Sequence, residues 1–121
     1  MGKKLEIVIV DDEIMITDLI QSFIQFSVKD ANVHSFDDAV DAYDFITNND
    51  IDVLITDYNM PRINGLQLME ATKPTTMRIM ISGYVSDIAE EKLHSLDAIF
   101  FEKPVPMKEL GSLISQRANA S

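Results

Sequence analysis

Residues 5–13 read LEIVIVDDE, a run of apolar side chains that stops abruptly at carboxylates. An apolar run with so little polar alternation is typical of a strand that is buried on both faces, as in a parallel sheet. Three later apolar runs are also followed directly by a polar group. Residues 53–56, VLIT, precede Asp57, and residues 79–81, IMI, precede Ser82. Residues 98–101, AIFF, precede residues 102–104, which read EKP. The chain therefore predicts buried parallel strands whose polar end groups share one edge of a sheet.

Segments of helical length separate the apolar runs, and this alternation indicates the fold class. We expect strands at Leu5–Val10, 33–36, 52–56, 77–81 and 98–101. We expect helices at 13–29, 38–48, 65–73, 86–96 and from 107 into the polar tail. Five strands and five helices in strict alternation predict a doubly wound α/β domain with a parallel sheet. Residues 1–121 are interpreted as one such domain, because no linker, repeat or low-complexity tract interrupts them.

Local signals place the helices within this pattern. In the first helix, the spacing predicts that Ile16, Ile20, Phe23 and Ser27 form the stripe that faces the core. The third helix must end before Pro74, because proline is excluded from a helix interior. Residues 86–87, Ser-Asp, are good capping residues for the fourth helix.

The composition limits the classes of partner. Twenty acidic residues oppose ten basic ones, which gives a net charge of -10. Such a surface repels nucleic acid and anionic lipid, and there is no basic cluster, so we expect no direct nucleic-acid binding.

No apolar run approaches the roughly 20 residues of a membrane helix. The chain has no cysteine, which excludes disulfides and thiolate metal sites. We expect a soluble protein without membrane contact, and the absence of cysteine is compatible with the cytoplasm.

Ligands of doubly wound sheets bind at the carboxyl ends of the strands, at the switch point of the topology. With the strand order 2-1-3-4-5, the first and third strands flank that point, and Asp11, Asp12 and Asp57 follow them. Two unit charges about 4 Å apart repel by roughly 4 kcal/mol at an effective dielectric constant near 20, so a cation must compensate. Oxygen ligands without cysteine or a nearby histidine favour Mg²⁺ over zinc or copper.

A carboxylate beside Mg²⁺ and a lysine can attack a phosphoryl group and form an acyl phosphate. Lys103 offers the positive charge, and Ser82 offers a hydroxyl donor to a phosphoryl oxygen. The Lys103-Pro104 bond is of the type that adopts the cis form most readily, and the sequence leaves its isomer open.

Each of these residues also has an ordinary structural explanation. An aspartate after a strand is usually a turn or capping residue, and Asp11 and Asp12 could simply begin a helix. Ser82 could be a turn residue, and Lys103 a solvated side chain. Their arrival at one edge of the sheet, each at a strand end, favours function over these separate explanations. By contrast, His34 and His94 are isolated and are interpreted as structural or surface residues.

In these motifs the chain resembles the receiver domain of two-component response regulators. The resemblance covers nearly the whole chain, and its motifs are IVIVDDE at 7–13, DYNMPRINGL at 57–66, ISG at 81–83 and FEKP at 101–104. It implies the five-stranded flavodoxin-like or CheY-like fold with the order 2-1-3-4-5.

The resemblance also implies a role for each site residue. Asp57 would be the phosphoacceptor. Asp12, Asp57 and the backbone carbonyl of Asn59 would ligate Mg²⁺, while Asp11 would act mainly through water. Lys103 would pair with the phosphoryl oxygens, and Ser82 and Phe100 would be the switch hydroxyl and the switch aromatic residue. Gly65 would fit the turn after the phosphorylation loop.

The family pattern is not matched everywhere. Phe100 lacks the tyrosine hydroxyl often found at its position, so any signal there must come from ring packing. Pro74 shortens the third helix, and the segment 94–98 lacks the glycine common before the last strand. Tyr84, two residues after Ser82, is expected to screen water from the acyl phosphate.

The resemblance implies a histidine kinase or a histidine phosphotransfer protein as phosphodonor, docked with help from Met15, Ile16 or Leu19. The signal would pass through the face formed by the fourth helix, fifth strand and fifth helix to a protein effector or an attached output domain, and a phosphorylation-dependent dimer stays open. The module would turn over no outside substrate.

Two other functions compete with this interpretation. An aspartate-nucleophile phosphatase usually has a second aspartate where this chain has Asn59. An interaction module that is never phosphorylated typically lacks one of the acids or the lysine, and none is missing here.

Overall fold

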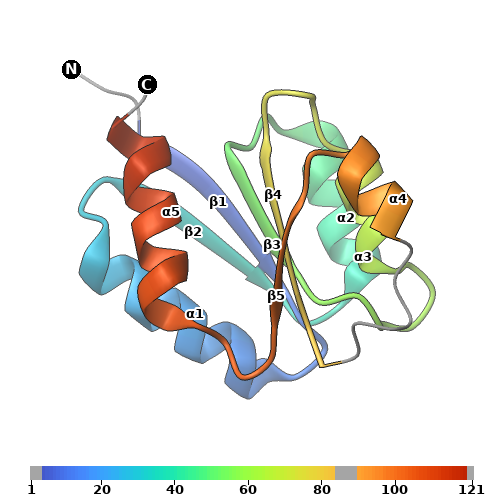
Figure 1. The fold of residues 1–121 in the computed structure, drawn as a ribbon, viewed down its shortest axis with the longest axis horizontal. Helices are drawn as coiled ribbons and strands as arrows, with labels where there is room; N and C mark the ends of the chain where they lie inside the picture. The colour runs from blue at the N-terminus through green and yellow to red at the C-terminus, as the bar shows by residue number, and fades with distance from the viewer. Residues whose placement is uncertain (1–3, 84–89, 120–121) are drawn as a thin grey trace.

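The computed structural model describes residues 4–83 and 90–119 and contains one five-stranded parallel sheet in the order β2-β1-β3-β4-β5 (Figure 1). The strands are β1 (Leu5–Val10), β2 (Ala31–Phe36), β3 (Val53–Thr56), β4 (Met77–Ser82) and β5 (Ile99–Glu102). The helices are α1 (Ile14–Ser27), α2 (Ala39–Asn48), α3 (Gly65–Glu70), α4 (Glu90–Ser95) and α5 (Met107–Asn119). The predicted alternation, fold class and strand order are confirmed.

Helices cover both faces of the sheet, α1 and α5 on one face and α2, α3 and α4 on the other (Figure 1). Successive strand residues point to opposite faces, so each strand supplies two cores. Ile7 and Ile9 of β1 pack in the core under α1 and α5, whereas Val8 and Val10 pack in the core under α2 and α3. This explains why the central strands are apolar without alternation. Within the described residues, no helix has both the length and the apolar character needed to cross a membrane.

The core-facing stripe of α1 agrees with the prediction except at its end. Ile20 is buried, Ile16 packs against the same core cluster and Phe23 is half-buried, whereas Ser27, which was expected in the stripe, is exposed. Thr17 and Ile24, which were not predicted to face the core, are also buried. Thr17 is buried without an unsatisfied hydroxyl because its Oγ1 donates to the carbonyl oxygen of Ile14 at 2.9 Å.

Two element boundaries also differ from the prediction. The third helix ends at Glu70, earlier than Pro74 requires, because the amides of Ala71 and Thr72 form tighter bonds to carbonyls three residues back, at 3.1 Å each. Strand β2 begins at Ala31, two residues earlier than expected, because it pairs with the full length of β1. The expected capping residues 86–87 lie outside the described residues.

Helix α4 ends in a Schellman turn. The amide of Ala98 donates to the carbonyl of Leu93 at 2.9 Å, and the amide of Asp97 donates to that of His94 at 3.0 Å. Asp97 occupies the left-handed region with φ 54 at the position where glycine is usual. This is the place where the sequence lacks the glycine common before the last strand. Aspartate tolerates the left-handed conformation better than most residues, so the turn persists without it.

Gly65 begins α3 at a point where there is no room for a side chain. A β-carbon on Gly65 would lie 2.3 Å from the main-chain oxygen of Asp57 and 2.9 Å from Cε of Met80. The amide of Gly65 also donates to the carbonyl of Tyr58 at 3.0 Å, which closes the loop after β3. The start of α3 is therefore pressed directly against the residue that follows β3.

We predict that Gly65→Ala destabilises the protein by about 1–3 kcal/mol, because the added methyl group collides with main-chain atoms that have no space to move. Urea unfolding measures the change. The matched control is Gly83→Ala, because a β-carbon there has nothing within 4 Å. An effect of Gly65→Ala no larger than that of the control would contradict the close approach.

Candidate functional site

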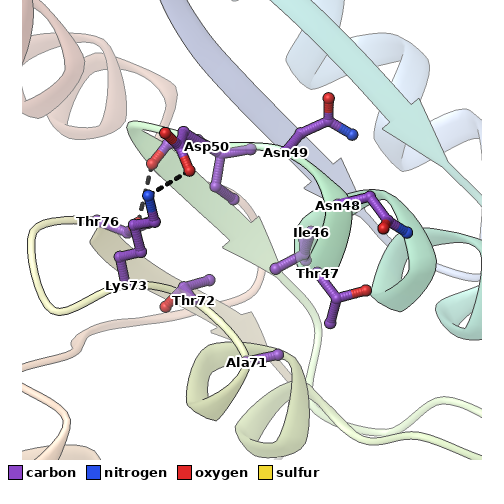
Figure 2. A pocket seen from close by; sticks show the side chains of 10 residues that line it. Ile46, Thr47, Asn48, Asn49, Asp50, Ala71, Thr72, Lys73 and Thr76 are labelled. Carbon is purple, nitrogen blue, oxygen red and sulfur yellow. Dashed lines mark hydrogen bonds and ion pairs between the residues drawn. The ribbon is translucent and has the colours of Figure 1, made fainter.

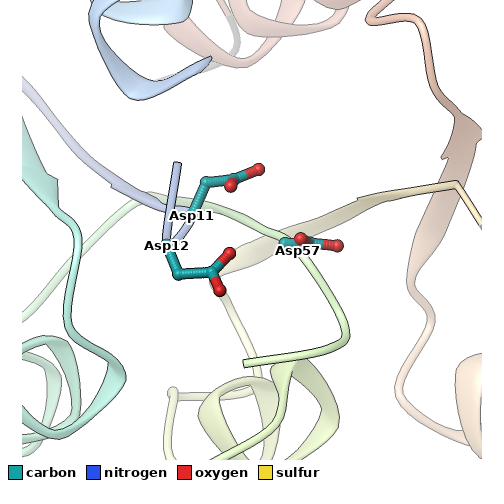
Figure 3. A group of neighbouring side chains, drawn as sticks. All are labelled: Asp11, Asp12 and Asp57. Atoms are coloured by element: carbon teal, nitrogen blue, oxygen red, sulfur yellow. The ribbon is translucent and has the colours of Figure 1, made fainter. Parts of the chain in front are cut away.

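The register of the sheet brings the predicted carboxylates together. Val10 of β1 pairs with Thr56 of β3, so the next residues, Asp11 and Asp57, leave neighbouring strands at the same level. Figure 3 shows the side chains of Asp11, Asp12 and Asp57 gathered at this edge. One carboxylate oxygen from each lies within 4.8 Å of the other two. The predicted convergence of these three residues is therefore confirmed.

Two of the three carboxylates are buried and are held by main-chain amides. Asp11 is 3% exposed and Asp57 is 9% exposed, whereas Asp12 is exposed. Asp11 Oδ1 accepts from the amide of Glu13 at 2.9 Å, and Asp57 Oδ1 accepts from the amide of Tyr58 at 2.7 Å. These bonds fix the orientation of both carboxyl groups and leave the second oxygen of each for another partner.

Lys103 is that partner. Its Nζ lies 3.0 Å from Asp11 Oδ2 and 3.3 Å from Asp57 Oδ2. Its amide donates to the carbonyl of Ser82 at 2.9 Å, which joins the ends of β4 and β5. The Lys103-Pro104 peptide bond, whose isomer the sequence left open, is cis. The lysine thus bridges the two buried carboxylates.

The ionisation of the site reflects this arrangement. Burial and the nearby charge of Asp11 raise the pKa of Asp57 above its ordinary value, and the charge of Lys103 only partly offsets them. Burial would by itself lower the pKa of Lys103, but the hydrogen bond and charge of Asp11, together with those of Asp57, outweigh burial and raise that pKa. One lysine does not fully balance the buried acids.

The donor set fits a hard divalent cation. All the clustered side-chain ligands are carboxylate oxygens, which suit Mg²⁺, and the shortfall of positive charge at Asp57 favours a cation. Asn59, whose carbonyl was predicted as a further ligand, is an exposed residue two positions beyond Asp57 in the loop between β3 and α3. The residues present therefore match the chemistry that Mg²⁺ requires.

The predicted switch residues occupy neighbouring strands. Ser82 is the last residue of β4 and is 1% exposed. Phe100 pairs in register with Met80, and it packs in the same core as Leu93 and Leu96 of the α4 region. Phe100 thus lies between the sheet and α4. Tyr84, expected to screen water, is outside the described residues.

Glu13 is a site residue that the sequence reasoning did not single out. Its Oε1 lies 3.9 Å from Lys103 Nζ, and its amide holds Asp11. The signal was the third acid in the DDE run, which was quoted without a role for its last member.

Helix α1 begins beside the carboxylates and exposes apolar side chains. Met15 is 82% exposed and Leu19 is 53% exposed, while Ile16 is half-buried against the core. Met15 and Leu19 are thus accessible to a protein partner, and Ile16 is largely explained by packing.

A hollow of about 300 Å³ lies at the opposite edge of the sheet, between the end of α2 and the residues after α3 (Figure 2). Lys73 and Asp50 form an ion pair beside it. Several of its polar side chains already bind main-chain groups: Thr76 Oγ1 donates to the carbonyl of Ile51 at 2.9 Å, and Asn49 Nδ2 donates to that of Phe45 at 2.9 Å. The carboxylate edge is the stronger candidate for chemistry.

Sequence comparisons identify similar proteins. The family model described as "Response regulator receiver domain" matches residues 7–115. A chemotaxis protein CheY homolog of Campylobacter jejuni is 34% identical over 70 residues, which cover 57% of this chain and 53% of that protein. The cyclic di-GMP phosphodiesterase response regulator RpfG of Xanthomonas campestris is 29% identical over 112 residues, which cover 88% of this chain and 30% of that protein.

Other relatives are much longer than this chain. The chain spans only 6% of the sensor histidine kinase RcsC of Escherichia coli, with 32% identity over 62 residues. Among solved structures, a CheY-like receiver domain protein from Methanospirillum hungatei superimposes with a TM-score of 0.82 at 23% identity, covering 98% of this chain and 96% of that one. At this identity the structural likeness supports the fold alone.

We predict that Asp57→Asn stabilises the protein at neutral pH in the absence of divalent ions. The raised pKa of Asp57 means that its contribution to stability is fully present below the ordinary value of 3.8 and is lost as the pH rises through the raised value. The variant carries no charge to bury, so its melting temperature should exceed that of the wild type by a few degrees at pH 7 and approach it near pH 4. Thermal unfolding across this range measures the difference.

The matched control is Asp18→Asn, which removes an exposed carboxylate of α1. Added Mg²⁺ should raise the melting temperature of the wild type more than that of Asp57→Asn, because ligands that bind the folded state stabilise it. A variant less stable than the wild type at pH 7 would contradict the charge imbalance.

Proposed function

Since this chain belongs to the response regulator receiver domain family, we propose that it is a single phosphorylation-switched receiver domain whose phosphoacceptor is Asp57. The observation that carries the proposal is the contact of Lys103 Nζ with both buried carboxylates, Asp11 Oδ2 and Asp57 Oδ2. An ordinary turn aspartate has neither a buried carboxylate neighbour nor a shared ammonium.

In the proposed reaction, a carboxylate oxygen of Asp57 attacks the phosphorus of a phosphodonor. The bond from phosphorus to the donor atom breaks, its electron pair leaves with the donor, and an acyl phosphate forms on Asp57. Lys103 stays within reach of the new phosphoryl oxygens and offsets their charge. Ser82, at the end of the next strand, would donate its hydroxyl to one of them. Hydrolysis reverses the state when water attacks the same phosphorus and Asp57 leaves as a carboxylate.

Asp11, Asp12, Asp57 and the backbone carbonyl of Asn59 would hold Mg²⁺, with Asp11 acting mainly through water. When bound, the ion would neutralise charge that develops on the transferred group. Asp12, the exposed carboxylate, gives solvent-side access to the ion, whereas the two buried carboxylates define the depth of the site.

A histidine kinase or a histidine phosphotransfer protein would supply the phosphoryl group, with Met15 and Leu19 of α1 available for docking. The phosphoryl group would bias an existing equilibrium between inactive and active forms, and Phe100 would carry the change to the face of α4, β5 and α5. The output is contact with a protein effector, an attached output domain or a second copy of the domain. We propose no turnover of an outside substrate and a cytoplasmic setting.

The direct test is incubation with Mg²⁺ and acetyl phosphate, followed by mass mapping of the labile modification. We expect one phosphoryl group on Asp57 and none in Asp57→Asn, because the variant has no carboxylate nucleophile. Asp18→Asn is the matched control and should label like the wild type. Label at another residue, or its absence from the wild type, would sink the proposal. Sustained hydrolysis of p-nitrophenyl phosphate would instead favour a phosphatase.

Replacement of the lysine separates its two roles. Lys103→Gln should bind Mg²⁺ several-fold more tightly, because it removes a positive charge that competes for Asp11 and Asp57. The same variant should accept the phosphoryl group roughly tenfold to a hundredfold more slowly, because the developing charge loses its fixed donor. Titration calorimetry and the labelling rate measure the two effects. Weaker Mg²⁺ binding, or an unchanged labelling rate, would show that Lys103 does not act as described.

A further inference from the structure

Arg78, near the start of β4 and away from the carboxylate edge, joins the ends of two helices. Arg78 Nε donates to the carbonyl of Met69 at 3.2 Å and to Thr72 Oγ1 at 2.9 Å. Its Nη2 donates to the carbonyl of Lys73 at 3.0 Å, and its Nη1 donates to that of Leu96 at 2.7 Å. The first three contacts cap the end of α3, and the fourth caps the end of α4. A single guanidinium thus connects both helix ends to the sheet.

The hydrogen bond from Arg78 to Leu96 lies at the turn that ends α4. Leu96 directly follows α4 and precedes Asp97, the left-handed residue of the Schellman turn. A second side-chain link from α3 to α4 is the ion pair of Lys92 with Glu70 at 3.1 Å, whose side chains are both exposed. Exposed pairs contribute little, so Arg78 is the main polar anchor for this end of α4 among the described residues.

The anchor lies on the strand face that also carries the proposed switch. Side chains at alternate positions of a strand share a face, which places Arg78, Met80 and Ser82 in one row along β4. Met80 pairs in register with Phe100, whose ring packs in the same core as Leu93 and Leu96. Ser82 and Phe100 thus act near one end of this row, and Arg78 fixes α4 at the other end.

We propose that Arg78 is a positioning residue for signal output: it fixes the C-terminal end of α4, so that α4 pivots about this point when Ser82 and Phe100 move. A helix held at one end turns a small displacement into a change of direction, whereas a helix held at neither end loosens. The coupling to Ser82 and Phe100 rests on the proposed phosphorylation switch. The anchoring of α4 stands on the hydrogen bonds alone.

The test compares the wild type with Arg78→Met and Arg78→Lys by amide hydrogen exchange, before and after treatment with Mg²⁺ and acetyl phosphate. In the untreated protein, residues 93–98 of Arg78→Met should exchange roughly tenfold or more faster, because the hydrogen bonds from a charged donor are lost. Arg78→Lys should be intermediate, because an ammonium keeps the charge but cannot span both helix ends. In both variants, Asp57 should be phosphorylated to the same extent as in the wild type.

The decisive readout is the change that phosphorylation causes at residues 90–96. It should be present in the wild type, reduced in Arg78→Lys and absent in Arg78→Met. The matched control is Arg117→Met, which removes an arginine of α5 that contacts Asp52 at 3.3 Å and should leave that change intact.

Each other outcome has a distinct meaning. Wild-type exchange in untreated Arg78→Met would overturn the anchor. Faster exchange with the phosphorylation-dependent change preserved would reduce Arg78 to a structural role and overturn the proposal. A wild type that takes no label on Asp57 would overturn the proposed function and with it the coupling, while the untreated samples would still report on the anchor.

Discussion

The charge balance between Lys103 and two buried carboxylates is the constraint on which the site depends. Asp11 and Asp57 are removed from water at the end of adjacent strands, and burial penalises their charged forms. One ammonium bridges them at 3.0 and 3.3 Å, yet the pKa of Asp57 is still raised by burial and by Asp11. The folded protein therefore holds a site that is short of positive charge. That shortage suits a divalent cation, and it would make the proposed addition or loss of a phosphoryl group a large electrostatic change.

The sheet makes this balance possible because it sets positions that no local segment sets. The parallel register places the residues after β1 and β3 side by side, and the bond from the Lys103 amide to the Ser82 carbonyl joins the ends of β4 and β5. Gly65 lets α3 begin in direct contact with the main chain of Asp57. The loop after β3 is therefore packed against the start of α3. Ser82 at the site edge and Arg78, which holds the end of α4, both belong to β4, so this strand connects the site with the anchored end of α4.

The errors in the sequence reasoning have physical causes. Thr17 was left out of the buried stripe of α1 because threonine reads as polar, although its hydroxyl is satisfied within the helix and its remaining atoms can be buried. The end of α3 was placed too late because Pro74 sets only an upper limit, whereas the tightened turn at Ala71 ends the helix earlier. Arg78 drew no attention because one arginine inside a predicted strand gives no local sign that its partners are carbonyls from two other elements.

Local sequence patterns were enough to predict the alternation of strands and helices, the polar residues at the strand ends and the oxygen-rich character of the site. These follow from local patterns: apolar runs, capping residues and prolines act over a few neighbours. The folded chain was needed to show that Lys103 bridges Asp11 and Asp57, that its bond to Pro104 is cis, and that Arg78 reaches Leu96. Those facts depend on distances between residues far apart in the chain, and packing across the whole sheet fixes them.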